Sequence, residues 1–92
     1  ELEGLLLTHP CIADAGVVGE PDARTPGDER PHAFVVLKPD AELSAVDVTN
    51  FIAGLVATYK HVKAVTFVGE IPKSASGKIL RRVLRDRLKE SA

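Results

Sequence analysis

A run of consecutive apolar residues in the segment HAFVVLK, residues 32–38, constrains the fold of this chain more than any other feature. A strand with one solvated face alternates apolar and polar residues, because neighbouring side chains point to opposite faces of the sheet. An unbroken apolar run predicts a strand that is buried on both faces. Such a strand needs covering elements on each side of its sheet, and the rest of the chain must supply them as helices.

Two more segments are predicted to form strands. Residues 12–18, IADAGVV, alternate well enough for a strand, in which Gly16 marks a bulge or a close approach of another element. Residues 64–68, AVTFV, form the third predicted strand. Between the first two lies a loop at residues 19–31 that is rich in turn formers and charges.

Three segments have helical periodicity. Leu2, Leu5 and Leu6 predict a first helix that Pro10 stops. A capping-box pattern at Ser44 and Asp47 opens the second helix. The apolar stripe of this helix comprises Val48, Phe51, Ile52, Leu55 and Val56. The third helix is predicted to start near Lys78, with an apolar stripe of Ile79, Leu80, Val83, Leu84 and Leu88. A basic side of this helix is formed by Arg81, Arg82, Arg85 and Lys89.

The order α-β-β-α-β-α predicts an α+β fold: a small three-stranded, mostly antiparallel sheet flanked by about three helices. A length of 92 residues, 45% hydrophobic and 27% charged, suits one globular domain that spans residues 1–92. The first helix begins at residue 1 without a cap, which suggests that the domain was cut from a longer chain.

The single cysteine, Cys11, excludes an internal disulfide framework and fits a reducing compartment. The three histidines, His9, His32 and His61, lack metal-binding spacing, so we expect surface or partly buried histidines and no metal site. No apolar run approaches the roughly 18 residues of a membrane span, and no signal peptide opens the chain. These features predict a cytoplasmic protein.

The formal net charge of −1 conceals an asymmetry between the two halves of the chain. Residues 1–50 carry 3 Lys/Arg against 10 Asp/Glu, whereas residues 51–92 carry 9 against 3. The second half can therefore offer a local anion site without making the protein generally basic. This balance argues against nonspecific nucleic-acid binding as the main function, because nucleic-acid-binding domains are usually basic overall.

The segment IPKSASGK, residues 71–78, connects the third strand to the last helix. It is not a Walker A loop, because Pro72 replaces the first glycine and Ile79 follows the lysine. Two interpretations stay open from spacing alone. In the first, Ser76 caps the helix and Lys78 is solvated. In the second, the small residues and Gly77 let the loop approach a phosphate closely, and the Lys78 ammonium interacts with the negative charge of that phosphate.

The whole chain resembles the C-terminal domain of the adenylate-forming acyl-activating enzymes: acyl-CoA synthetases, coumarate:CoA ligases and beetle luciferases. The resemblance rests on ELEGLLLTHPCIADAGVVGEPD, PHAFVVLKP, ATYKHVKAVTFV and IPKSASGKILRRVLR, in this order. The last of these matches the family motif P-K-[ST]-x-[ST]-G-K-[IL]-x-R at every specified position. The segment PDARTPGDERPHAF runs about two residues longer than the family pattern, which puts the contacts of that loop in doubt.

The resemblance implies a C-terminal lid domain of a larger AMP-forming ligase, whose hinge and N-terminal domain lie upstream of Glu1. In the family, a carboxylate attacks the α-phosphate of Mg-ATP to give an acyl-adenylate, and a thiol, usually that of CoA, then displaces AMP. By position, Lys78 matches the lysine that enters the active site for the first step, on a loop with Ser76 and Gly77. ATP, Mg²⁺ and CoA would be bound mainly by the N-terminal domain, and the isolated 92 residues would be inactive.

Lys60, Arg24 and Arg30 are candidates for contact with CoA or with the N-terminal domain, whereas Lys73 is expected to be a structural or surface charge. The expected partners are that domain, a carboxylic acid, ATP and CoA, with no nucleic acid. The identity of the acid depends on the absent domain. The rival hypothesis is a stand-alone nucleotide- or nucleic-acid-binding module that uses the basic second half.

Overall fold

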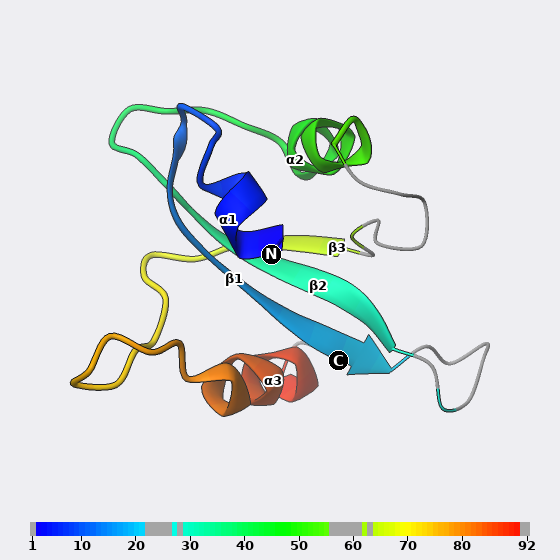
Figure 1. Cartoon of the computed structure of the whole chain (residues 1–92), viewed down its shortest axis with the longest axis vertical. Coiled ribbons are helices and arrows are strands. Elements are labelled where there is room, and N and C mark those ends of the chain that lie inside the picture. Colours follow the sequence, from blue (N-terminus) through cyan, green and yellow to red (C-terminus); the bar gives the residue numbers. More distant parts are fainter. Residues whose placement is uncertain (1, 22–26, 28, 56–61, 63, 91–92) are drawn as a thin grey trace.

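The computed structural model describes residues 2–21, 27, 29–55, 62 and 64–90. One sheet crosses the molecule, with α1 and α2 on one side of it and α3 on the other (Figure 1). The elements are α1 (Leu2–Leu6), β1 (Ile12–Pro21), β2 (Glu29–Leu37), α2 (Ala45–Ala53), β3 (Ala64–Phe67) and α3 (Arg81–Glu90). The predicted α+β class and the order α-β-β-α-β-α are confirmed.

The sheet has the strand order β1-β2-β3, so the apolar strand β2 is central. β1 and β2 are antiparallel from the pair Ile12 and Leu37 to the pair Pro21 and Glu29. β2 and β3 are parallel over a shorter stretch, beginning with His32 beside Ala64. A parallel pair needs a crossover connection, and α2 lies within that connection. The sheet is therefore mixed, with its longer pairing antiparallel.

Apolar clusters cover both faces of the sheet, as the unbroken apolar run of β2 predicts. On the face covered by α1 and α2, here the α1/α2 face, Ala33 and Val35 are buried. The cluster on this face comprises Leu6, Ile12, Ala15, Ala33, Val35, Val48, Ile52 and Val62. On the opposite face, here the α3 face, the cluster comprises Val18, Phe34, Ile71 and Leu84.

The register of β1 changes near its start. Ile12 pairs with Leu37 and Asp14 pairs with Val36, so Ala13 is an extra residue in β1, a β-bulge. Gly16, where we predicted a bulge or a close approach, is a close approach. A Cβ at this position would lie 2.9 Å from Leu84 Cδ1, so the glycine lets α3 pack directly against the sheet.

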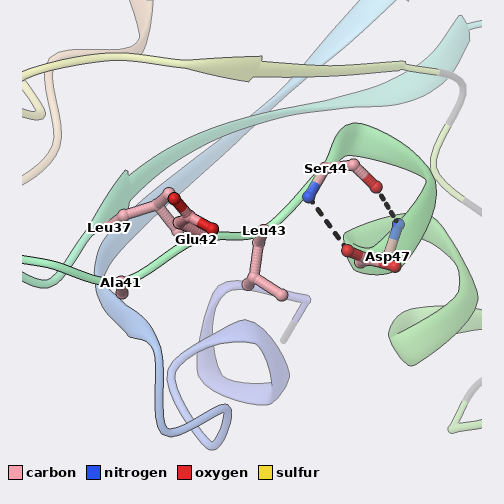
Figure 2. Close-up of a pocket in the computed structure, with 6 residues that line it drawn as sticks. All are labelled: Leu37, Ala41, Glu42, Leu43, Ser44 and Asp47. Carbon is pink, nitrogen blue, oxygen red and sulfur yellow. Dashed lines mark hydrogen bonds between the residues drawn. The ribbon is translucent and has the colours of Figure 1, made fainter.

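The predicted capping box of α2 is present (Figure 2). The Ser44 hydroxyl accepts a hydrogen bond from the Asp47 N–H (3.1 Å), and the Asp47 carboxylate accepts one from the Ser44 N–H (3.0 Å). The apolar stripe of this helix is shorter than predicted, because α2 ends at Ala53 with Gly54 as its C-cap. Leu55 therefore lies beyond the helix and is 51% exposed.

Candidate functional site

Residues 72–80 fold into a tight hairpin, here called the Lys78 hairpin. Lys73 and Ile79 form an antiparallel bridge. The Ser74 N–H donates to the Lys78 carbonyl at 2.9 Å, and the Leu80 N–H donates to the Pro72 carbonyl at 2.9 Å. These bonds join the two limbs of the hairpin across its turn.

The hairpin corrects the prediction that the last helix starts near Lys78. α3 begins at Arg81, because the Lys78 carbonyl accepts across the hairpin and Ile79 pairs with Lys73. Lys78 is therefore not in the first turn of a helix. The burial of the predicted apolar stripe also differs from the prediction. Leu80 and Val83 are each 39% exposed, whereas Leu84 is fully buried.

Gly77 and two serines shape the turn of the hairpin. Gly77 has φ +86°, a left-handed conformation that favours glycine, as the sequence analysis expected. The Ser74 and Ser76 hydroxyls are hydrogen-bonded at 2.9 Å, and the Ser74 hydroxyl also accepts from the Lys78 N–H at 3.3 Å. Ser76 therefore stabilises the turn and does not cap α3.

Apolar contacts hold the base of the hairpin against the α3 face. Ile71, just before the hairpin, is 5% exposed and belongs to the cluster on this face. Ile79, on the second limb, packs against the same cluster. A Cβ on Gly16 would lie 3.4 Å from Ile71 and 3.6 Å from Ile79, so the base of the hairpin runs close over β1.

Two ion pairs flank the hairpin. Lys73 Nζ lies 2.6 Å from Asp14 Oδ2 on β1, which gives Lys73 a structural partner. Arg81, the first residue of α3, contacts both carboxylate oxygens of Glu3 at 2.7 and 2.8 Å. The same Glu3 accepts a hydrogen bond from the Val17 N–H of β1 at 2.8 Å. The sequence analysis missed both acids, because nothing in the chain's local pattern pairs residues so far apart.

Lys78 lies beside the turn of the hairpin and is exposed to solvent. Among the described residues its ammonium makes no ion pair or hydrogen bond. The hairpin, drawn in orange, extends sideways beyond the start of α3 (Figure 1). The backbone of this loop is thus fixed by hydrogen bonds, while the charge at position 78 is free to meet an anion outside the described residues.

The structure does not bring the other candidate residues to this hairpin. Arg30 is exposed and pairs in register with Glu20, near the end of β1, six residues on from Asp14. Six strand residues span about 20 Å, so Arg30 is remote from the Lys73–Asp14 ion pair. It lines a shallow hollow formed by Val17, Val18, Gly19, Glu29, Arg30 and Pro31. Lys60 and Arg24 lie outside the described residues.

A second, open depression lies before α2 (Figure 2). Its lining residues are Leu37, Ala41, Glu42, Leu43, Ser44 and Asp47. The Asp47 carboxylate is engaged in the capping box, so this depression offers few free polar groups. It also lies away from the Lys78 hairpin, next to the helix that covers the opposite face of the sheet.

His32 is buried, and the sequence pattern did not distinguish it from the other two histidines. His32 is 7% exposed, and its two ring nitrogens lie 2.8 Å from Glu20 Oε1 and 2.7 Å from Thr66 Oγ1. It therefore links all three strands on the α3 face, and its ring packs on Phe34. Both polar atoms of the ring are satisfied, which makes His32 a structural residue.

Metal binding and membrane crossing find no support in the described part of the chain. No three histidine, cysteine or acidic side chains within it are grouped so that they could hold a metal ion. None of its helices combines the length and the apolar character that a membrane crossing requires.

Comparisons with known proteins assign the chain to one family. The sequence model described as AMP-binding enzyme C-terminal domain matches residues 1–78. A 4-coumarate–CoA ligase-like protein of Arabidopsis thaliana is 52% identical over 88 residues, which cover 96% of this chain and 16% of that protein. The chain spans 15–17% of the length of the curated relatives that it matches first.

Solved structures agree with the sequence comparison. ATP-bound MatB from Rhodopseudomonas palustris superposes with a TM-score of 0.85 at 28% identity, over 96% of this chain and 17% of that one. The anthranilate CoA ligase AuaEII in complex with anthranoyl-AMP superposes with a TM-score of 0.82 at 33% identity, over 99% of this chain and 18% of that one.

Proposed function

Because the chain belongs to the family of AMP-binding enzyme C-terminal domains found in acyl-CoA synthetases and CoA ligases, we propose that it is the mobile C-terminal domain of an ATP-dependent, AMP-forming acid–thiol ligase. The relatives are about six times as long as this chain, which supports a large N-terminal domain as its main partner. On this proposal the 92 residues alone are inactive, because we assign the sites for the acid and the nucleotide to the other domain. We place this ligase in the cytoplasm.

The proposed catalytic residue is Lys78. When a carboxylate attacks the α-phosphate of ATP, two anions approach each other and negative charge builds around phosphorus. An ammonium placed beside both groups stabilises that charge more in the transition state than in the separated reactants. The observation that carries this proposal is the exposed Lys78 on a backbone held by the hairpin hydrogen bonds.

The proposed cofactors are ATP, Mg²⁺ and CoA. MatB is described as ATP-bound and AuaEII as a CoA ligase in complex with anthranoyl-AMP, which supports ATP, an acyl-adenylate and CoA for this enzyme. We assign Mg²⁺, like most of the contacts to ATP and CoA, to the N-terminal domain, as the family resemblance implies. Lys60, Arg24 and Arg30 remain proposed contacts for CoA or that domain.

The test is the substitution Lys78→Ala in the full-length enzyme. Loss of one preorganised electrostatic group typically lowers the rate by about 10²–10³-fold. We therefore expect a loss of this size in carboxylate-dependent ATP–pyrophosphate exchange, with little change in thioester formation from pre-made acyl-adenylate. Equal loss of both half-reactions in a folded variant would contradict the role of Lys78.

The nucleic-acid-binding alternative gains no support. The family and its relatives are ligases, and Arg81, on the basic side of α3, is already paired with Glu3. A salt-sensitive affinity of the chain for RNA or DNA would be needed to revive it.

A further inference from the structure

The two limbs of the Lys78 hairpin are each tied to the acidic first half of the chain. Lys73 precedes Lys78 by five residues and contacts Asp14 at 2.6 Å. Arg81 follows Lys78 by three residues and contacts Glu3 at 2.7 Å. The charged group at position 78 is therefore bracketed by two ion pairs, one on either side of the turn.

The β-bulge of β1 directs Asp14 toward the hairpin. Residues two apart in a regular strand lie on the same face, so Asp14 would share the α1/α2 face with the buried Ile12. The extra residue Ala13 shifts the alternation by one. Asp14 then lies on the α3 face, opposite Val36, where it meets Lys73. Re-aiming a side chain is a known use of bulges near functional sites.

Glu3 connects three elements around the free edge of the sheet. It belongs to α1, which packs on the α1/α2 face, yet its partner Arg81 begins α3 on the other face. Its Oε2 also accepts the Val17 N–H at 2.8 Å, so β1 fixes the carboxylate between the two helices. The side chain of Glu3 is 19% exposed and contacts Arg81 through both oxygens. Both contacts come from one guanidinium nitrogen, Nη2, and such short charge-assisted hydrogen bonds hold the Arg81 end of the hairpin close to Glu3.

Apolar packing alone does not set the direction in which the hairpin extends. The contacts of Ile71 and Ile79 hold the hairpin base on the α3 face, but the hydrophobic effect is non-directional. The two ion pairs supply directional restraints at either end of the loop. Small misplacements of a reacting group lower rates strongly, by about 10²-fold for a shift near 1 Å.

We propose that Glu3 and Asp14 are positioning residues, which orient the hairpin so that Lys78 reaches the acyl-phosphate centre. This proposal rests on the function proposed above for Lys78. Neither acid touches substrate; each acts through its basic partner, Arg81 or Lys73.

The test uses Asp14→Asn and Glu3→Gln in the full-length enzyme, each of which removes the charge and keeps the side-chain shape. We expect kcat for adenylate formation to fall about tenfold, by carboxylate-dependent ATP–pyrophosphate exchange, with KM for ATP and acid unchanged. Thioester formation from pre-made acyl-adenylate should keep its rate. The matched control is Glu42→Gln, an exposed acid in the depression before α2, which should keep the wild-type kcat.

A charge swap separates positioning from a general structural effect. Lys73→Asp alone should lower kcat as Asp14→Asn does, and the double variant Asp14→Lys with Lys73→Asp should recover most of the loss. A double variant no better than Lys73→Asp alone would overturn the positioning role of this pair.

Lys78→Ala, measured in parallel, distinguishes the catalytic role of Lys78 from the positioning role of Glu3 and Asp14. If Lys78→Ala lowers exchange while Asp14→Asn and Glu3→Gln keep the wild-type kcat, the positioning role is overturned and the role of Lys78 stands. If Lys78→Ala itself leaves exchange unchanged, both the proposed function and the positioning role are overturned.

Discussion

The two faces of the sheet differ in what they contribute. Among the described residues, the α1/α2 face buries a cluster of eight apolar residues, so it mainly supplies stability. The α3 face buries a cluster of four in the same part of the chain, and over it lies the hairpin that presents Lys78. The comparison indicates that the α1/α2 face contributes mainly to folding, whereas the α3 face contributes to folding and also carries the proposed chemistry. Substitutions in the α1/α2 cluster should therefore change stability, and substitutions over the α3 face should change activity as well.

The largest effect on stability is expected from Ile52→Ala on α2. Ile52 is fully buried in the cluster of the α1/α2 face. Truncation of a buried isoleucine typically costs 2–5 kcal/mol, so the unfolding free energy from urea denaturation should fall by about that amount. The matched control is Val46→Ala on the same helix, 66% exposed, which should stay within about 0.5 kcal/mol of the wild type. Similar losses for both variants would show that α2 does not anchor the core.

Gly16→Ala tests the close contact between β1 and α3 on the α3 face. The added methyl would lie 2.9 Å from Leu84 Cδ1 and 3.4 Å from Ile71, in a region that is already packed. Overpacking of this kind costs about 1–3 kcal/mol. We expect this loss in urea denaturation, together with slower adenylate formation in the full-length enzyme.

The control for Gly16→Ala is Gly4→Ala in α1, where an added methyl meets nothing within 4 Å. Alanine favours a helix over glycine, so this variant should be unchanged or more stable by up to about 1 kcal/mol. A Gly16→Ala variant as stable as wild type would contradict the tight approach of α3 to the sheet.

Gly77→Ala should have a smaller effect, confined to the hairpin. Its φ of +86° is unfavourable for alanine by about 1–2 kcal/mol, although no atom obstructs the new methyl. Amide hydrogen exchange should therefore accelerate at residues 77 and 80, with little change in β2. Gly69→Ala is the control, because Gly69 has open space and no positive φ. Unchanged exchange in Gly77→Ala would contradict a turn that requires glycine at position 77.

Local patterns allowed much of the fold to be predicted. The capping box at Ser44 and Asp47 is a short-range signal, and it forms as expected. The burial of both faces of β2 also follows from the sequence, because a run of apolar residues leaves no face for solvent. These features depend on neighbours along the chain, which sequence patterns describe well.

The start of α3 could not be predicted for the opposite reason. Ile79 and Leu80 fit helical spacing, but Ile79 forms an antiparallel bridge with Lys73 and is therefore not part of the helix. The outer side of α3 also differs from the prediction, since Val83 fits the stripe by spacing and yet is 39% exposed. At the start of α3, tertiary pairing overrode local propensity.

The acidic partners of the hairpin were equally out of reach of sequence patterns. Glu3 and Arg81 are 78 residues apart, and only the folded sheet brings them together. The charge asymmetry between the two halves of the chain was the one available signal, because it predicts attraction between an acidic first half and a basic second half. It could not identify which residues pair.

The central claim is that Lys78 serves chemistry and not stability, and one variant tests it directly. In Lys78→Ala, adenylate formation by the full-length enzyme and the free energy of unfolding should be measured together. The account predicts a rate loss of about 10²–10³-fold with an unfolding free energy within about 0.5 kcal/mol of the wild type. A wild-type rate, or a rate loss accompanied by destabilisation of about 2 kcal/mol or more, would contradict it.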